Sequence, residues 1–144
     1  MTENADEKFM KEAIKQAKEA MAKGEVPIGA VIVYEDRIIA RACNMVETLN
    51  DATAHAEMLA FTSASQEAGK YLNQCTLYVT LEPCPMCLGA AFWTQIRRIV
   101  FGASDNRNII ANKNDILHPK TIVQGGVMEN ECSQLIKDFF KSKR

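Results

Sequence analysis

The chain has 144 residues, a formal net charge of −1 at pH 7, 47% hydrophobic residues and 24% charged residues. This length predicts a single domain, residues 1–144, which buries about 68 to 70% of its unfolded surface and forms a sizeable core without disulfides. The composition excludes a disordered or fibrous protein. Because no apolar run approaches the roughly 18 residues that span a bilayer, we expect a cytoplasmic protein without a membrane partner.

The N-terminal part of the chain predicts a helix followed by a β-hairpin. Apolar residues recur at helical spacing over Phe9–Met21, and Gly24 is a natural end for that helix. Two β-branched runs follow, PIGAVIVY at 27–34 and RIIARACN at 37–44. The dipeptide Glu35–Asp36 separates them, so we expect a hairpin whose turn lacks the usual glycine.

The rest of the chain alternates helices and strands. In chain order, we expect a helix at 55–67 closed by Gly69, a strand at 75–81, a helix at 85–95 opened by Pro85, a strand at 97–103, a short strand at 121–126, and a last helix whose apolar stripe holds Cys132, Leu135, Ile136, Phe139 and Phe140. Residues 103–120 lack clear periodicity and indicate a long loop or short elements, and such loops are often functional.

This order of elements predicts an α/β fold in which helices cover both faces of a central sheet. Ligands of such sheets bind at the carboxyl ends of the strands. The two sequence motifs described next both fall at helix starts at this edge of the sheet.

The segment TAHAEMLAF, residues 53–61, places His55 two residues before Glu57. Positions two apart point to opposite sides of a regular helix, so these side chains can converge only where a helix begins. Thr53 is a candidate capping residue, which would place His55 in the first turn. On its own, the pair also fits an ordinary histidine beside an exposed glutamate on a surface helix.

Five cysteines give no paired disulfide framework. Cys84 and Cys87, in LEPCPMC, are three residues apart at a helix start, where both sulfurs can face one point and the positive helix end favours thiolate. A zinc ribbon would need a second CxxC, and a redox pair would leave His55 unexplained. The others lie singly in apolar surroundings and are expected in the core: Cys43, Cys75 and Cys132.

Together, His55, Cys84 and Cys87 predict a catalytic zinc site. Three protein ligands leave the fourth tetrahedral position to water. Zinc lowers the pKa of bound water from about 15.7 towards about 7. Glu57 beside that water can carry its proton to a leaving amine, an acid–base contribution of typically about 100 to 10,000-fold. We therefore expect one Zn²⁺ per chain and a catalytic role for Glu57.

The combination of HxE with PCxxC resembles the signature of zinc-dependent nucleobase deaminases. The segments GEVPIGAVIV, TAHAEMLA, LYVTLEPCPMC, RIVFGASD and FFKSKR look like the bacterial tRNA-specific adenosine deaminase family over nearly the whole chain. This resemblance implies a cytidine-deaminase-like fold, a three-layer α/β/α sandwich with a central mixed sheet. It also implies a homodimer that binds the anticodon loop of a tRNA, converts its wobble adenosine to inosine and releases ammonia.

The resemblance extends to substrate-binding residues. Asn44 corresponds to the family asparagine that hydrogen-bonds the purine ring, although an asparagine there could also simply start a turn. Pro27, Ile28 and the backbone at Ala56 correspond to pocket walls. His118, in LHPK, is expected to be a loop residue without a catalytic role.

Basic residues are candidates for RNA contacts. Arg107 follows the ASD segment, but Ile109 stands where the family usually has glycine, which indicates an altered loop. The basic tail residues Lys141, Lys143 and Arg144 either meet phosphates or serve as ordinary cations at a helix end. The net charge of −1 does not indicate whether the chain binds RNA, because local charged patches matter more than the total charge.

Two alternatives remain open at this stage. EPCPMCLGAAFW, which includes Trp93, is similar to guanine deaminases, so the substrate could be a free base, guanine or less readily cytosine. A binding protein that keeps zinc for structure alone is the more distant alternative. Glu57 argues against it, because a structural zinc site needs no proton shuttle and usually closes its fourth position with a protein ligand.

Overall fold

The helices and strands follow the predicted order. The structure is a computed structural model that describes residues 4–107 and 113–143. Its elements are α1 (Ala5–Ala22), β1 (Gly29–Tyr34), β2 (Arg37–Cys43), α2 (Ala56–Ala68), β3 (Thr76–Leu81), α3 (Pro85–Thr94), β4 (Arg98–Ala103), a short 3₁₀ helix (Lys113–Asp115), β5 (Ile122–Gln124) and α4 (Glu129–Ser142). Helix α1 begins earlier than predicted because Asn4 caps it, accepting a 2.8 Å hydrogen bond from the Glu7 N–H.

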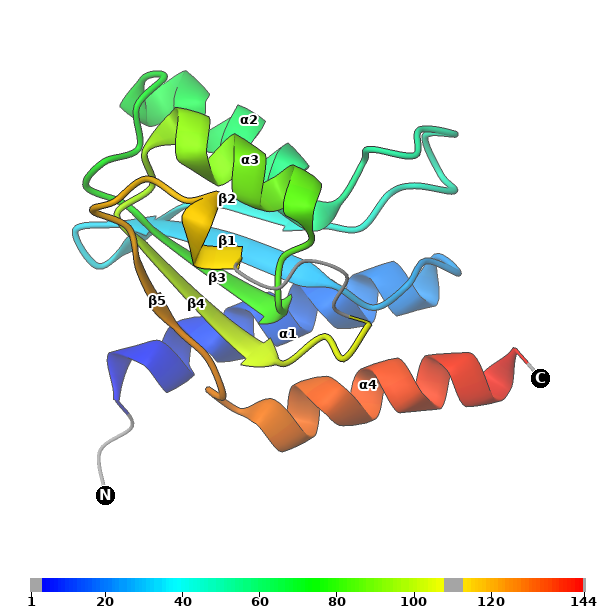
Figure 1. The fold of residues 1–144 in the computed structure, drawn as a ribbon. Coiled ribbons are helices and arrows are strands. Elements are labelled where there is room, and N and C mark those ends of the chain that lie inside the picture. Colours follow the sequence, from blue (N-terminus) through cyan, green and yellow to red (C-terminus); the bar gives the residue numbers. More distant parts are fainter. Residues whose placement is uncertain (1–3, 108–112, 144) are drawn as a thin grey trace.

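The five strands form one mixed sheet in the order β2-β1-β3-β4-β5. Strand β1 is antiparallel to β2 and β3, whereas β3, β4 and β5 run parallel. The start of β1 and the ends of β2, β3 and β4 therefore meet at one edge, where Gly29 pairs with Cys43 and Leu81 pairs with Ala103. Helices α2 and α3 also begin at this edge (Figure 1).

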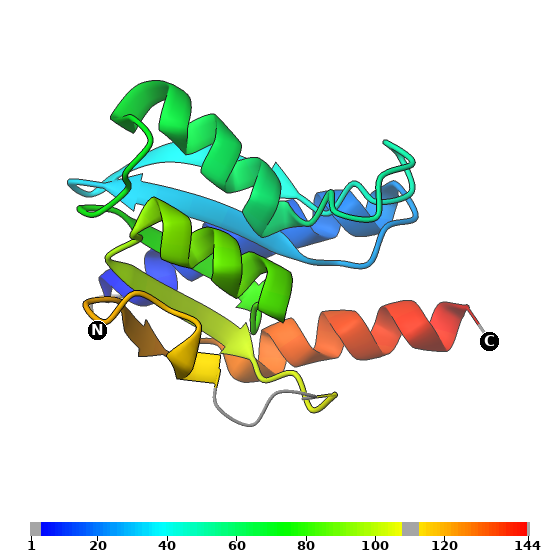
Figure 2. The ribbon, with the colours of Figure 1, turned by 45° about the horizontal axis from the view of Figure 1, so that its top comes forward.

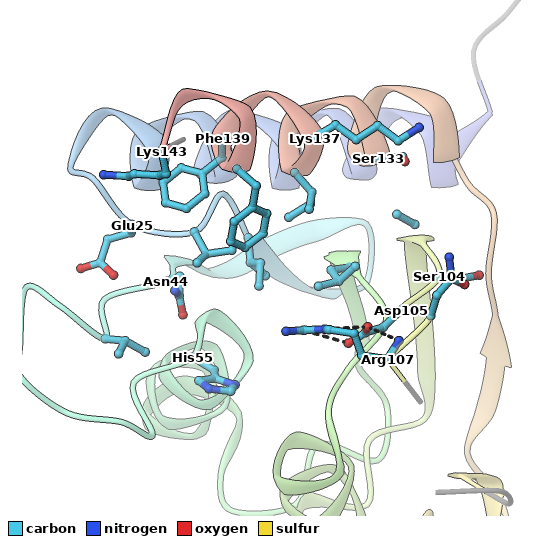
Figure 3. Close-up of a pocket in the computed structure, with 18 of the residues that line it drawn as sticks. Glu25, Asn44, His55, Ser104, Asp105, Arg107, Ser133, Lys137, Phe139 and Lys143 are labelled. Atoms are coloured by element: carbon cyan, nitrogen blue, oxygen red, sulfur yellow. Dashed lines mark hydrogen bonds and ion pairs between the residues drawn. The ribbon is translucent and has the colours of Figure 1, made fainter. Parts of the chain in front are cut away.

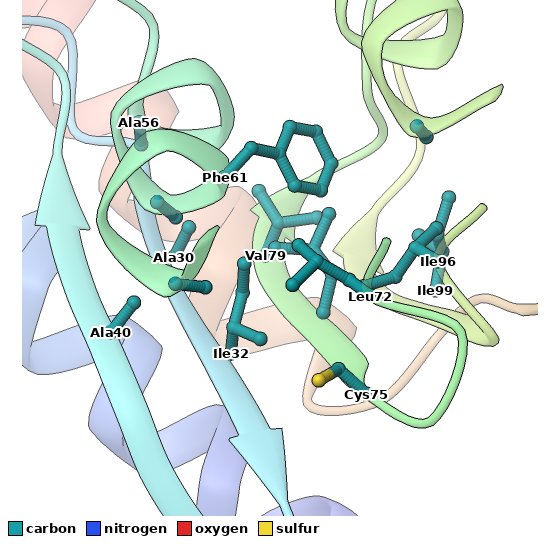
Figure 4. Packing of buried hydrophobic residues seen from close by; sticks show 14 of the residues in the cluster. Ala30, Ile32, Ala40, Ala56, Phe61, Leu72, Cys75, Val79, Ile96 and Ile99 are labelled. Atoms are coloured by element: carbon teal, nitrogen blue, oxygen red, sulfur yellow. The ribbon is translucent and has the colours of Figure 1, made fainter. Parts of the chain in front are cut away.

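Helices cover both faces of the sheet, which confirms the predicted α/β/α sandwich. Figure 2 shows α2 and α3 on one face and α1 and α4 on the other. The core under α2 and α3 includes Phe61, Leu72 and Ile96 (Figure 4). The core under α1 and α4 includes Met10 and Tyr78. The single cysteines are buried, as predicted: Cys43, Cys75 and Cys132.

The hairpin turn between β1 and β2 forms without glycine. Glu35 and Asp36 have φ angles of 49° and 60°, so both adopt the left-handed backbone that tight hairpin turns require. Aspartate tolerates this region better than most residues. The predicted hairpin is therefore confirmed, with some backbone strain at Glu35.

Within the described residues, we find no helix long and apolar enough to cross a membrane.

Candidate active site

The two sequence motifs lie at the starts of two neighbouring helices, α2 and α3. His55 and Cys84 are the residues that immediately precede α2 and α3, and Pro85 opens α3 as predicted. The prediction that Thr53 caps α2 is wrong. Its hydroxyl instead donates to the Asp51 carboxylate at 2.8 Å, which closes a turn before the helix and leaves the helix start at His55.

The three predicted ligand atoms converge. His55 Nδ1 lies 3.6 Å from Cys84 Sγ and 3.6 Å from Cys87 Sγ, and the two sulfurs are 3.8 Å apart. A tetrahedral zinc ion, with Zn–S near 2.3 Å and Zn–N near 2.1 Å, places its ligand atoms about 3.6 to 3.8 Å apart. The donor set and its spacing therefore fit zinc.

The local electrostatics favour a thiolate at Cys84, whereas the hydrogen bond with Cys84 raises the pKa of Cys87. The hydrogen bond with the Cys87 thiol, reinforced by the His55 ring, lowers the pKa of Cys84 to about 4. The hydrogen bond between Cys84 and the His55 ring raises the pKa of His55. Because metal ligands must be deprotonated, a depressed cysteine pKa at the helix start prepares the site for a cation.

Glu57 lies one residue into α2 and is 4% exposed. Burial raises the pKa of its carboxyl group to about 7. Its Oε1 atom has no hydrogen-bond partner among the described residues. A buried carboxyl group near neutrality with a free oxygen can both accept and donate a proton at pH 7.

An open cleft of about 1140 Å³ lies beside this cluster, and His55 forms part of its wall (Figure 3). Asn44 and Ile28 also line it. Asn44 is 5% exposed, and its backbone N–H donates to the Ile28 carbonyl at 3.0 Å. Its side-chain amide makes no hydrogen bond with the described part of the chain, so it is available to a ligand in the cleft.

Residues 3–103 match a family described as the cytidine and deoxycytidylate deaminase zinc-binding region. The chain belongs to this deaminase family. It is 45% identical over 146 residues to the tRNA-specific adenosine deaminase of Bacillus subtilis, covering 96% of this chain and 91% of that protein. The family model and the converging ligands together establish a zinc-dependent deaminase, and they confirm the predicted zinc cofactor.

Solved deaminase structures share the fold. One, from a study of A-to-I editing by tRNA:A34 deaminases at the wobble position of transfer RNA, is 38% identical with a TM-score of 0.82, covering 89% of this chain and 98% of that chain. The guanine deaminase of Bacillus subtilis is 44% identical with a TM-score of 0.65, covering 68% of this chain and 64% of that chain. These likenesses confirm the predicted cytidine-deaminase-like fold.

The other predicted pocket residues of the deaminase lie beside the cleft. Pro27 and Ala56 are fully buried next to Ile28 and His55, and their side chains are not among those that line the cleft. The predicted contact of a ligand with the backbone at Ala56 stays a prediction. His118 lies on a loop, where its ring is near that of Phe92, and it is not part of the cleft wall.

The structure places some of the predicted RNA-contacting residues at the cleft and others outside it. Arg107 lines the cleft with a side chain that is 80% exposed, and its guanidinium Nε donates to Asp105 at 3.1 Å. Lys143 also lines the cleft, whereas Lys141 is exposed outside it. Arg144 and Ile109 lie outside the described residues.

Helix α4 forms a wall of the cleft that was not predicted. Phe139 is 8% exposed, but Phe140 is 46% exposed, and both line the cleft together with Ile136 and Lys137. The prediction that Phe140 belongs to the buried stripe is therefore wrong. Adjacent helical residues point about 100° apart, so two consecutive phenylalanines do not share one narrow face.

Proposed function

We propose that this chain is a hydrolytic deaminase that converts the wobble adenosine of a tRNA anticodon to inosine and releases ammonia. The observation that carries the proposal is the buried carboxyl group of Glu57, whose Oε1 has no partner among the described residues, close to the converging zinc ligands, of which His55 lines an open cleft. Full-length similarity to proteins named tRNA-specific adenosine deaminases supports the choice of substrate.

Three side chains would hold the metal: His55 through Nδ1, and Cys84 and Cys87 through Sγ. Zinc bound there would supply a water whose pKa is lowered towards about 7. Glu57 Oε1 accepts a proton as the water oxygen bonds to the purine carbon. Glu57 then donates a proton to the amino nitrogen, which leaves as ammonia. Adenosine and water thus give inosine and ammonia.

The base is held next to these groups. The side-chain amide of Asn44, which has no partner among the described residues, hydrogen-bonds the purine ring, since its NH2 group can donate and its carbonyl oxygen can accept. Ile28 provides an apolar wall with the fully buried Pro27 beside it, and the backbone at Ala56, at the start of α2, offers a donor that the helix does not use. The base must leave its stack to enter this site.

Basic residues around the opening contact the RNA backbone. Arg107 and Lys143 line the cleft, and Lys141 with Arg144 extends the positive charge along the tail. A cleft of about 1140 Å³ exceeds what a free base fills, and it leaves room for flanking nucleotides of a splayed anticodon loop. These residues would therefore bind phosphates rather than select the base.

The proposal treats residues 1–144 as one deaminase domain that works as a homodimer in the cytoplasm, where tRNA substrates are available. An exposed aromatic pair on α3 supports the proposal of a homodimer. Trp93 is 76% exposed and packs edge-on against Phe92, with ring centroids 5.5 Å apart. Exposed aromatic pairs of this kind are typical of protein interfaces. Sedimentation of the purified chain at twice the monomer mass would support this assembly.

Guanine is the second candidate substrate. The guanine deaminase of Bacillus subtilis is 44% identical to this chain, but the likeness covers only 68% of it. A panel of anticodon stem-loops, adenosine, cytidine, cytosine and guanine would separate the candidates. We expect inosine from a stem-loop with adenosine at the wobble position and no xanthine from guanine. Xanthine without inosine would favour the free-base enzyme.

A further inference from the structure

Glu25 is a buried acid that the proposed chemistry does not use. It lies between α1 and β1, is 1% exposed and lines the cleft. No described residue forms an ion pair with it. A carboxylate removed from water is costly unless hydrogen bonds compensate it. Its persistence at the wall of the active-site cleft therefore calls for a structural or functional reason.

Within the described part of the chain, all the hydrogen bonds of this carboxylate come from one loop. Glu25 Oε1 accepts from the Glu47 N–H at 3.1 Å. Its Oε2 accepts from both the N–H and the hydroxyl of Thr48, each at 2.6 Å. Although burial alone would raise the pKa of Glu25, the bonds from Thr48 and Glu47 keep it below its ordinary value. The carboxylate therefore stays charged, which strengthens these three bonds.

The loop that Glu25 holds connects two residues of the active site. It runs from Asn44, at the end of β2, to His55, at the start of α2. Its base is closed by the Met45 N–H, which donates to Ala54 at 3.0 Å. The Asn44 N–H donates to Ile28 at 3.0 Å. Segment 25–28 thus holds the first part of the loop by hydrogen bonds at two places, Glu25 and Ile28.

We infer that Glu25 is a positioning residue that fixes residues 44–48 so that the Asn44 amide faces the cleft. Figure 3 shows Glu25, Asn44 and His55 along one wall of the cleft. The inference rests on the proposed function, in which the Asn44 amide binds the base. Glu25 itself contacts no reacting atom, so its loss should weaken substrate binding more than it slows the chemical step.

The hydrogen-bond pattern shows which substitutions test this role. Glu25→Gln keeps the size of the side chain but replaces one acceptor oxygen with a donor, which then faces an N–H group of the loop. Thr48→Val removes only the hydroxyl donor and keeps the backbone bond. Glu19→Gln is the matched control, since Glu19 is an exposed acid of α1 that loses the same charge.

The experiment measures KM and kcat on a wobble-adenosine stem-loop with the zinc-loaded full chain. For Glu25→Gln we expect KM to rise roughly 5 to 20-fold, kcat to change less than about two-fold and zinc content to stay unchanged. Thr48→Val should raise KM by a smaller factor, and its effect should be smaller still in the Glu25→Gln background, because both changes weaken the contact between residue 25 and the same loop. Glu19→Gln should behave like the unmodified chain.

Amide hydrogen exchange gives a readout that needs no substrate. In Glu25→Gln the amides of Glu47 and Thr48 should exchange at least about ten-fold faster, while those of α2 keep their protection. Unchanged exchange, an equal effect of Glu19→Gln, or a fall in kcat without a change in KM would overturn the inference. If the unmodified chain deaminates no stem-loop, the proposed function fails, whereas faster exchange would still support the anchoring of the loop by Glu25.

Discussion

Glu57 is the residue on which the acid–base chemistry depends. It sits within two residues of a predicted zinc ligand, yet its carboxyl group has a free oxygen and a pKa of about 7. The geometry separates these roles, because His55 precedes the helix while Glu57 lies inside its first turn. Substitution can therefore remove proton transfer and leave the metal in place.

The first prediction concerns Glu57→Gln. Glutamine has a similar shape but transfers no proton at neutral pH, so turnover should fall about 100 to 10,000-fold while zinc content and fold persist. Single-turnover assays with parallel elemental analysis measure both quantities. Near-normal turnover in this variant would contradict the assigned role.

The second prediction concerns the metal ligands. Cys87 is 1% exposed and its sulfur lies 3.6 Å from His55 Nδ1, so Cys87→Ala should lose most of the bound zinc. Cys75→Ala is the control, because Cys75 is equally buried but belongs to the core. Elemental analysis of both proteins, purified without chelator, should find about one zinc per chain only in the control. Equal zinc in both would show that Cys87 is not a ligand.

Residue-level prediction succeeded where the signal is local. The spacing of His55, Cys84 and Cys87 is visible along the chain, because each lies at a helix start. Asn44 was assigned only through family resemblance, since nothing near it in sequence shows a cleft. Glu25 was missed because its two partner residues, Glu47 and Thr48, are more than twenty residues away and donate mainly through backbone groups.

At the scale of elements, the start of α1 is fixed to the sheet by a polar contact. Asp6 accepts hydrogen bonds from Arg98 on β4, at 2.8 and 2.7 Å, and from the Tyr78 hydroxyl on β3 at 2.8 Å. The hydrogen bond from Arg98, with that from Tyr78, holds the pKa of Asp6 below its ordinary value of 3.8. The contact explains why the helix extends to Ala5, beyond its apolar repeat.

The third prediction is that Asp6→Asn lowers the free energy of unfolding by about 1 to 3 kcal/mol at pH 7, because a charge-assisted contact is lost. Since the folded-state pKa lies below 3.8, this stabilisation is fully present above that pH and disappears as the pH falls through the folded-state pKa. Urea unfolding of the metal-free proteins at a series of pH values measures this effect. The free energies of unfolding of Asp6→Asn and of the unmodified chain should become equal only below about pH 4.

The control for this prediction is Asp115→Asn, because Asp115 is an exposed acid that forms no hydrogen bond or ion pair with the sheet among the described residues; this change should leave the free energy of unfolding unaltered. A constant difference between Asp6→Asn and the unmodified chain down to pH 2 would contradict the electrostatic explanation.

Element prediction worked because apolar periodicity and helix-ending residues are local. Gly24 and Gly69, for example, have φ angles of 79° and 87° at the ends of α1 and α2. The boundary of α1 and the cap of α2 were predicted less well. Both depend on side-chain hydrogen bonds, of Asn4 and of Thr53 with Asp51, that periodicity does not encode.

At the scale of the whole molecule, the cleft joins segments from both halves of the sequence. The loop after β2, the start of α2, the end of β4 and helix α4 all reach the same edge of the sheet. Sequence order predicted that edge as the ligand site. The contribution of α4 was not predicted, because its placement depends on packing against the opposite face from α2 and α3.

The fourth prediction concerns the basic residues of the tail, of which Lys143 lines the cleft. Replacing Lys141, Lys143 and Arg144 with alanine should raise KM for an anticodon stem-loop several-fold and leave kcat largely unchanged. Each lost phosphate contact should also flatten the dependence of log affinity on log salt by roughly one unit.

The control for the tail replaces three exposed basic residues that do not line the cleft, Lys18, Arg37 and Lys70. This triple variant should keep both the affinity and the salt slope of the unmodified chain. An unchanged KM in the tail variant would mean that the tail is an ordinary solvated helix end.

The most direct test of hydrolytic wobble deamination is to map inosine, position by position, in a full-length tRNA transcript after incubation with the zinc-loaded chain, while ammonia is measured in the same reaction. The account predicts inosine at the wobble position alone, one ammonia for each inosine, and formation of both products at least about 100-fold slower with Glu57→Gln. A chain that holds zinc and deaminates free guanine, but leaves every adenosine of the transcript intact, would contradict it.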